Sequence, residues 1–225
     1  MSRFKRLGPT AIAAAGTGVG LATFGVGRAS PETHRQIESE DSPPPRSKGY
    51  FGSSLQLSTA VTLAGESLLP HHHDFPKTAA NIGIGVAQRV IGIAGAAYYG
   101  QKYAKDGELG DLLKAGGYGA FAVHGALRGL QSTKPHPVAT PAVGALAGFA
   151  KSLASGPIEA VGYAADALAN AGEAGHGVAK SKSRLSPLVP GIDLKTIVRS
   201  QRVGAAALGV GAMYQIYKNG RDHED

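Results

Sequence analysis

Residues 141–155 read PAVGALAGFAKSLAS, and together with the next residue they place a small side chain at every fourth position. The members of this row are Gly144, Gly148, Ser152 and Gly156. Residues four apart lie on one face of an α-helix, and a glycine inside a helix costs roughly 1 kcal/mol relative to alanine. The row therefore needs a packing reason, which small residues supply because they let two helix backbones approach closely. The stretch predicts a helix that packs tightly against another helix.

The same small-residue chemistry recurs along the chain, which contains 33 glycines. The further rows that we expect to pack helices are Gly16 and Gly20; Gly92, Ala96 and Gly100; Gly125 and Gly129; and Gly204, Ala207 and Gly211. Rows of this kind are typical of helices that pack in a bilayer or in a tight helical assembly. We expect their partners to be copies of this chain or other subunits.

Hydrophobic periodicity and helix breakers predict a mainly α fold with little or no β structure, extended rather than compact. We expect five to seven Ala/Gly-rich helices joined by Pro/Gly loops. The segments with helical patterns are residues 10–27, 54–69, 78–105, 109–131, 141–155 with a continuation to 172, and 193–218. In the second segment a strand is the alternative to a helix, because it contains the β-branched residues Thr59, Val61 and Thr62. Asp193 is the expected N-cap of the last helix.

Composition shifts divide the chain into four predicted regions. An apolar helix at residues 1–27 is followed by an extended linker at 28–53, which contains the triple proline of residues 43–45 and dense charge. A helical hairpin region follows at 54–134, and a C-terminal helical region at 135–225.

The apolar stretch at residues 10–27, TAIAAAGTGVGLATFGVG, carries no charge and follows a basic start. This pattern resembles a secretory signal or an organellar presequence. Recurrence of the same Gly/Ala chemistry in later segments favours a retained packing helix instead. Residues 7–27 are long enough for a bilayer span, which needs about 20 residues, although Ala and Gly drive insertion weakly. The sequence allows this helix to pack against either lipid or protein.

Charge and composition limit the classes of function. Charged residues make up 17% of the chain, where about 25% is typical, so we expect its surface to be covered by a partner. The net charge is +7, which favours anionic neighbours such as nucleic acid or anionic lipid. The residues expected to contact such a partner are Arg3, Lys5, Arg6, Arg28, Lys195, Arg199 and Arg202. The absence of cysteine excludes disulfides and thiolate metal sites.

Motifs for catalysis and cofactor binding are missing from the sequence. It contains no phosphate-binding loop, no HExxH and no GxSxG. The single GxGxxA, at Gly117, Gly119 and Ala122, follows a helical pattern rather than a strand. The HHHD cluster at residues 71–74 is expected to be a solvated loop, and Glu159 with Asp166 lacks pocket-forming neighbours. We therefore expect no enzyme activity, cofactor, metal or small-molecule substrate.

The composition and the order of segments are similar to those of internal and DNA-ejection proteins of tailed bacteriophages. Such proteins lie ordered in a virion and later line a conduit through the host envelope. The resemblance implies a non-enzymatic structural subunit of a large assembly, located in a virion and able to enter a host membrane. Its expected partners are copies of itself, other subunits, a membrane and nucleic acid bound without sequence specificity. The alternative is an integral membrane subunit of a cellular or organellar complex.

Overall fold

The computed structural model describes residues 47–68, 79–130, 138–181, 184–189 and 192–221. This part of the chain forms α-helices and one short 3-10 helix, without a strand, so the prediction of a mainly α fold is confirmed. The elements are α3 (Ser47–Glu66), α4 (Ala79–Asp106), α5 (Leu109–Leu130), α6 (Ala139–Leu153), α7 (Pro157–Lys180), η2 (Ser186–Leu188) and α8 (Leu194–Arg221). The predicted region 1–27, and residues 28–46 of the predicted linker 28–53, lie outside it.

Local sequence signals explain several helix ends. Gly107 adopts a left-handed backbone with φ 69° in the turn between α4 and α5, a conformation that glycine reaches without steric cost. Gly156 and Pro157 separate α6 from α7, with proline at the first helical position. Asp193 accepts a hydrogen bond from the backbone N–H of Thr196 at 2.6 Å, so the expected cap of the last helix is present.

Helix α3 confirms the helix predicted in the second segment but starts earlier than predicted. Residues 54–66, for which a strand was open, are helical, and the helix already begins at Ser47. Residues 47–53 are therefore helical and do not continue the extended linker. The buried hydroxyls of Thr59 and Thr62 donate to the carbonyl oxygens of Leu55 and Ser58, one turn back, so both hydroxyls are satisfied within the helix.

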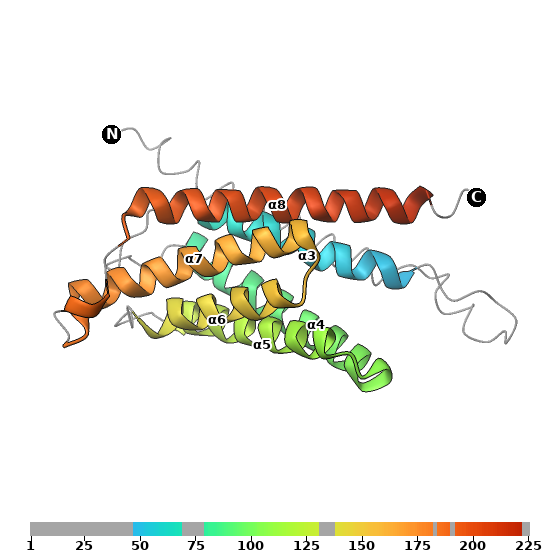
Figure 1. The fold of residues 1–225 in the computed structure, drawn as a ribbon, viewed down its shortest axis with the longest axis horizontal. Helices are drawn as coiled ribbons and strands as arrows, with labels where there is room; N and C mark the ends of the chain where they lie inside the picture. Colours follow the sequence, from blue (N-terminus) through green and yellow to red (C-terminus); the bar gives the residue numbers. More distant parts are fainter. Residues whose placement is uncertain (1–46, 69–78, 131–137, 182–183, 190–191, 222–225) are drawn as a thin grey trace, which may run out of the picture.

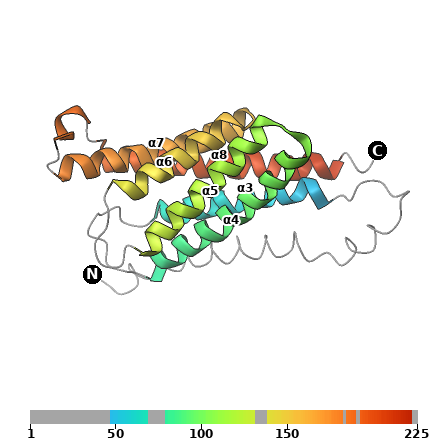
Figure 2. The same ribbon diagram turned by 90° about the horizontal axis from the view of Figure 1, so that it is seen from below.

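The six α-helices of the described residues form a closed ring. Each packs against the next one in the chain, and α3 packs against α8 to complete the circle. Figure 1 and Figure 2 show an elongated bundle in which α4 with α5, and α6 with α7, form antiparallel hairpins and α8 runs along one edge. Contacts of α3 with α8 and of α5 with α6 join the predicted regions 54–134 and 135–225. Both regions therefore contribute to one interior.

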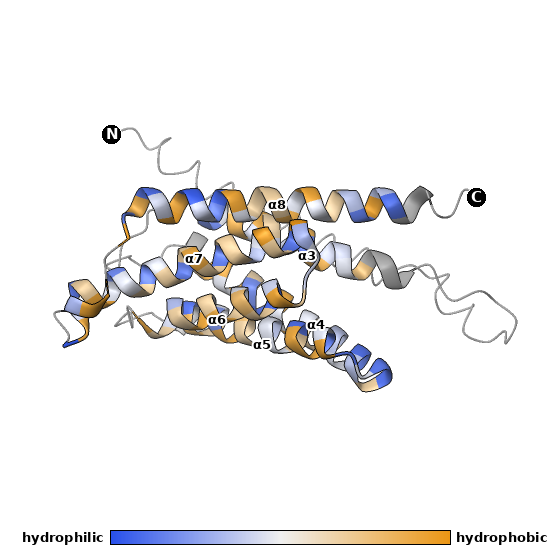
Figure 3. Cartoon of the chain, viewed as in Figure 1, coloured by the Kyte–Doolittle hydropathy of each residue, from blue (hydrophilic) through white to orange (hydrophobic). Residues whose placement is uncertain are grey.

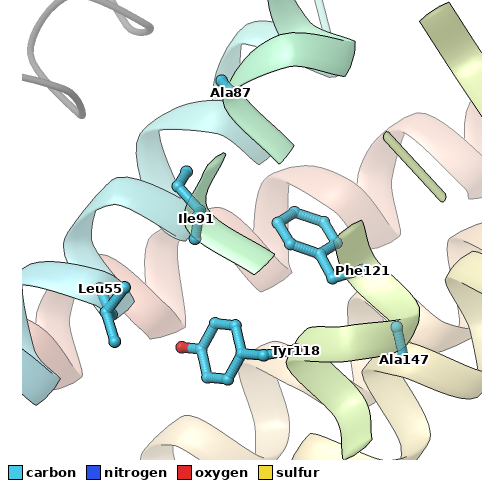
Figure 4. Close-up of a cluster of buried hydrophobic side chains, with 6 residues drawn as sticks. All are labelled: Leu55, Ala87, Ile91, Tyr118, Phe121 and Ala147. Carbon is cyan, nitrogen blue, oxygen red and sulfur yellow. The ribbon is translucent and has the colours of Figure 1, made fainter. Parts of the chain in front are cut away.

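Apolar residues lie inside the ring and also along its outer surface, where they recur on α6, α7 and α8 (Figure 3). The largest buried cluster combines side chains from α3 to α6 (Figure 4). Its members are Leu55, Ala87, Ile91, Tyr118, Phe121 and Ala147. A second cluster joins α3, α7 and α8 through Ala60, Leu63, Tyr163 and Leu208. Many of these residues are small, so close approach of the backbones fills the interior.

Candidate functional site

The expected helix-packing row on α6 faces α7. A Cβ atom at Gly148 would lie 2.8 Å from the backbone nitrogen of Ala167, and one at Gly144 would lie 2.3 Å from Asn170 Oδ1. Ser152 donates its hydroxyl hydrogen to the carbonyl oxygen of Ala160 at 3.1 Å. Gly156 has open space around it in the turn before α7. Three of the four members of the row therefore meet α7 of the same chain.

The rows on α4 and α5 face each other. A Cβ at Gly92 would lie 2.4 Å from the backbone nitrogen of Ala122, and one at Gly125 would lie 2.5 Å from the carbonyl oxygen of Gly85. Ala96 packs against the main core cluster. Gly100 has no neighbour within 4 Å, and Gly129 is close to the end of α5.

The row on α8 faces α7 and α3. A Cβ at Gly204 would lie 2.8 Å from the carbonyl oxygen of Gly162 on α7, and one at Gly211 would lie 2.6 Å from Gln56 Nε2 on α3. Ala207 is half-buried, and Gly16 and Gly20 lie outside the described residues. In the described part of the chain, the rows hold one molecule together. The expected contacts of these rows with copies or partner subunits stay a prediction.

Sequence reasoning missed several glycines with equally close neighbours. A Cβ at Gly95 would lie 2.3 Å from the Tyr118 ring, one at Gly117 would lie 2.6 Å from Lys151 Cγ, and one at Gly162 would lie 2.5 Å from Leu208 Cγ. Gly117 belongs to the GxGxxA match, so its role in this structure is helix packing. Only its position in a helical pattern could have signalled that role.

The interior of the ring holds a buried lysine, which sequence reasoning also missed. Lys151 on α6 is fully buried, and its Nζ lies 4.3 Å from the ring centroid of Phe121, 4.6 Å from that of Tyr163 and 5.0 Å from that of Tyr118. Three aromatic faces thus surround the ammonium group, which they attract through their quadrupoles. Burial lowers the pKa of Lys151 to about 8, and attraction by Asp166 opposes the shift.

Asp166 on α7 is the acidic counterpart of this lysine. Burial raises its pKa to about 7, while Lys151 acts in the opposite direction. Asn170 Nδ2 donates to Asp166 Oδ1 at 3.0 Å. The hydroxyl groups of Tyr118 and Tyr163 share a hydrogen bond of 3.0 Å nearby, and burial raises the pKa of Tyr118 to about 12. The tyrosines therefore stay neutral, and the charges in this part of the interior are those of Lys151 and Asp166.

A second polar group joins α3, α4 and α5. The Glu66 carboxylate forms an ion pair with Arg128 and accepts a hydrogen bond from Gln88 Nε2 at 3.0 Å.

His124 Nδ1 lies 2.8 Å from the carbonyl oxygen of Thr140; since a carbonyl only accepts, Nδ1 carries the hydrogen. Burial lowers the pKa of His124, which favours the neutral ring. Of the two carboxylates noted in the sequence, Glu159 pairs with Lys114 at 3.8 Å and accepts a hydrogen bond from Gln215, whereas Asp166 accepts one from Asn170.

Exposed apolar side chains recur at helical spacing along α6, α7 and α8. Figure 3 shows apolar residues distributed along these helices. On α6, Leu146, Phe149 and Leu153 are 60%, 57% and 62% exposed. We call these three residues, together with Ile158, Val161 and Leu168 of α7, the α6/α7 outer stripe. Similar residues follow α8, namely Val203, Val210, Met213, Tyr214 and Tyr217. Large exposed apolar patches mark sites of interaction with proteins or membranes.

Among the expected anion contacts, Lys195, Arg199 and Arg202 are exposed on the first turns of α8. Their spacing of four and three places them on one helix face. Arg3, Lys5, Arg6 and Arg28, and the HHHD cluster at 71–74, lie outside the described part of the chain.

Two further features of the described residues bear on the class of protein. No group of three or more His, Asp or Glu side chains among them could hold a metal ion. None of the described helices combines the length and apolar character needed to cross a membrane. Comparison of the chain with protein families, with curated proteins and with solved structures finds no match.

Proposed function

We propose that this chain is a non-enzymatic structural subunit of a large assembly, which it joins through the outer apolar faces of its helices. The observation that supports this proposal is the α6/α7 outer stripe, in which Leu146, Phe149 and Leu153 are each more than half exposed. The small-residue rows on α4, α5, α6 and α8 already face neighbouring helices of the same chain. The bulky side chains on the outer faces of these helices then remain for contacts between molecules.

Within this class, we propose a bacteriophage virion protein of the internal or DNA-ejection type. Support comes from the similarity in composition and segment order to such proteins, and from the net charge of +7. Lys195, Arg199 and Arg202 supply a basic face on α8 that suits phosphate contacts without base readout. Exposed apolar faces would also suit a later association with the host envelope.

The alternative proposal, an integral membrane subunit, is favoured by the same exposed stripe, because lipid covers apolar surface as well as protein does. The two proposals differ in what contacts Phe149. They are separated by placing a photoreactive benzoylphenylalanine at position 149 in the full-length chain and irradiating cells that express it. The matched control places the same group at Lys180, which is exposed at the end of α7.

Protein adducts at position 149, at least several-fold more abundant than at position 180, are the expected result. Adducts with lipid alone, together with retention in the membrane pellet after carbonate extraction, would support the membrane subunit instead. Equal and low yields at both positions would contradict both proposals, because the stripe would then face water.

A further inference from the structure

The connection between α7 and α8 carries the most exposed large apolar side chain of the described residues. Leu188, the last residue of η2, is 76% exposed, and Leu185, which precedes η2, is 58% exposed. The backbone N–H of Leu188 donates to the carbonyl oxygen of Leu185 at 2.9 Å. Residues three apart eclipse one another in a 3-10 helix, so the two leucines project on the same side. They present an apolar surface to the solvent.

This connection lies at one end of the elongated bundle. Figure 1 and Figure 2 both show it at the end of α7, opposite to the end that carries the turn between α4 and α5. Helix η2 packs against α7, and Gly177 and Val178 in the last turn of α7 are buried. The two leucines are therefore carried by a packed part of the fold.

The first turns of α8 lie at the same end of the bundle. A Cβ at Gly172 of α7 would lie 3.1 Å from Ile197 Cγ1 of α8, and one at Gly162 would lie 2.5 Å from Leu208 Cγ. Residue numbers thus rise along α7 as they fall along α8, so the two helices are antiparallel. The start of α8 consequently lies beside the last turns of α7, at the end that carries η2.

The surface at this end is basic. Arg184 directly precedes Leu185, and Lys195 and Arg199 are exposed on the first turns of α8. Among the described residues between 184 and 202, the single acidic one is Asp193, whose carboxylate accepts the capping hydrogen bond from the backbone of α8. We call the following five residues the basic tip: Arg184, Leu185, Leu188, Lys195 and Arg199.

Apolar side chains flanked by basic groups match the surface of a membrane that contains anionic lipid. At such a surface, leucine side chains enter the boundary between headgroups and acyl chains, and lysine and arginine stay with the lipid phosphates. Nucleic acid also offers phosphates, but it would leave Leu185 and Leu188 in water. The described residues of the tip include no aromatic ring on which a base could stack. The exposed leucines therefore favour lipid over nucleic acid.

We propose that the basic tip binds the surface of membranes that contain anionic phospholipid. Leu185 and Leu188 insert below the headgroups, and Arg184, Lys195 and Arg199 contact the headgroup phosphates. This inference rests on the proposed function for its setting, since it names the residues and the lipid class through which the chain would associate with an envelope. Attachment through one end of the bundle does not require the α6/α7 outer stripe.

The test measures cosedimentation of the full-length chain with vesicles of phosphatidylcholine alone, or of phosphatidylcholine and phosphatidylserine in equal parts. The chain should bind the anionic vesicles only. Leu185→Ser with Leu188→Ser should lower the partition coefficient at least about tenfold through lost apolar burial, and Lys195→Gln with Arg199→Gln should lower it by a similar factor. The matched controls, Leu109→Ser and Lys105→Gln, change exposed residues near the opposite end and should leave binding unchanged. Circular dichroism verifies that each variant is helical.

A fluorescence measurement locates the inserted residue. The chain contains no tryptophan, so Leu188→Trp supplies a single fluorophore. Its emission should shift to the blue on anionic vesicles and be quenched by brominated acyl chains, whereas the emission of Leu109→Trp should not change. A chain that binds the vesicles without changing the emission of Leu188→Trp would overturn the proposal, because another surface would then carry the binding.

Two further results would overturn the basic tip as a lipid site. One is a wild-type chain that does not bind the anionic vesicles. The other is binding to duplex DNA, lost in Lys195→Gln with Arg199→Gln, by a chain that ignores the vesicles. The assembly proposal has its own readout in the protein adducts at position 149, which form without vesicles. Failure of either proposal is therefore seen separately from failure of the other.

Discussion

Lys151 and Asp166 are two ionisable groups in the interior of the ring, where burial of a charge lowers the stability of the fold. Burial lowers the pKa of Lys151 to about 8 and raises that of Asp166 to about 7, although each attracts the other. Both shifts disfavour the charged forms. The pair therefore lowers stability most between about pH 7 and pH 8, where both groups are ionised. The three aromatic faces around Lys151 offset part of this cost.

The charge on Lys151 should be visible in the pH dependence of stability. Its pKa is about 8 in the folded chain, against an ordinary value of 10.5. Between these values the unfolded chain binds more protons, so the free energy of unfolding should rise with pH by on the order of 3 kcal/mol. Lys151→Met should abolish this rise, measured by urea unfolding from pH 7 to pH 10. Lys180→Met should retain it, and an equal slope in Lys151→Met would show that the buried ammonium is not its source.

Glycine at position 148 is required by a backbone contact. A Cβ there would lie 2.8 Å from the nitrogen of Ala167 and 2.9 Å from the oxygen of Tyr163. Gly148→Ala should therefore lower the free energy of unfolding by roughly 1–3 kcal/mol. Gly119 on α5 has no neighbour within 4 Å, and Gly119→Ala should raise it by up to about 1 kcal/mol through helix propensity. Thermal unfolding measures both, and shifts of the same sign would contradict the packing of α6 on α7.

A spacing of four identifies a helix face in the sequence but not what covers that face. Gly92 and Gly100 belong to one predicted row, yet a Cβ would clash with α5 only at Gly92. Lys151 could not be assigned to the interior in advance, because its aromatic neighbours come from α5 and α7. Such contacts follow from the tertiary arrangement, which local periodicity does not contain.

At the scale of the helices, periodicity and breakers located the elements well. The segments predicted at 78–105, 109–131 and 193–218 correspond to Ala79–Asp106, Leu109–Leu130 and Leu194–Arg221. The early start of helix α3 could not be predicted, because its first residues, SKGYFGS, follow prolines and carry little apolar periodicity. The buried contacts of Glu66 with Gln88 and Arg128 were missed because they join three different helices.

The ion pair of Glu66 with Arg128 ties α3 to α5. Both side chains are largely buried, at 3% and 15% exposure. Arg128→Met leaves the Glu66 carboxylate without its cation, and breaking a buried pair in this way costs about 3–5 kcal/mol. The double variant with Glu66→Gln should recover at least half of that loss, because it removes the unpaired charge. Urea unfolding at pH 7 measures both variants. Absence of recovery would show that Arg128 contributes through packing rather than charge.

At the scale of the molecule, the ring reverses part of the usual distribution of side chains. Lysine, glutamate, aspartate and amide groups lie in its interior, while leucine, phenylalanine, valine and tyrosine side chains are exposed outside. Gly148 and its neighbour Phe149 represent the two sides, because Gly148 contacts α7 and Phe149 is 57% exposed. Gly148 thus packs within the chain, and the association that we propose between molecules uses the exposed side of α6 that carries Phe149.

Sedimentation velocity of Phe149→Ser beside the wild-type chain tests this division most directly. The wild-type chain should sediment as an oligomer, whereas Phe149→Ser should shift to the monomer with unchanged helical circular dichroism and thermal unfolding. Gly148→Leu should instead lose the folded state. The account is contradicted if Phe149→Ser assembles like the wild-type chain, or if Gly148→Leu stays folded and only its assembly is lost.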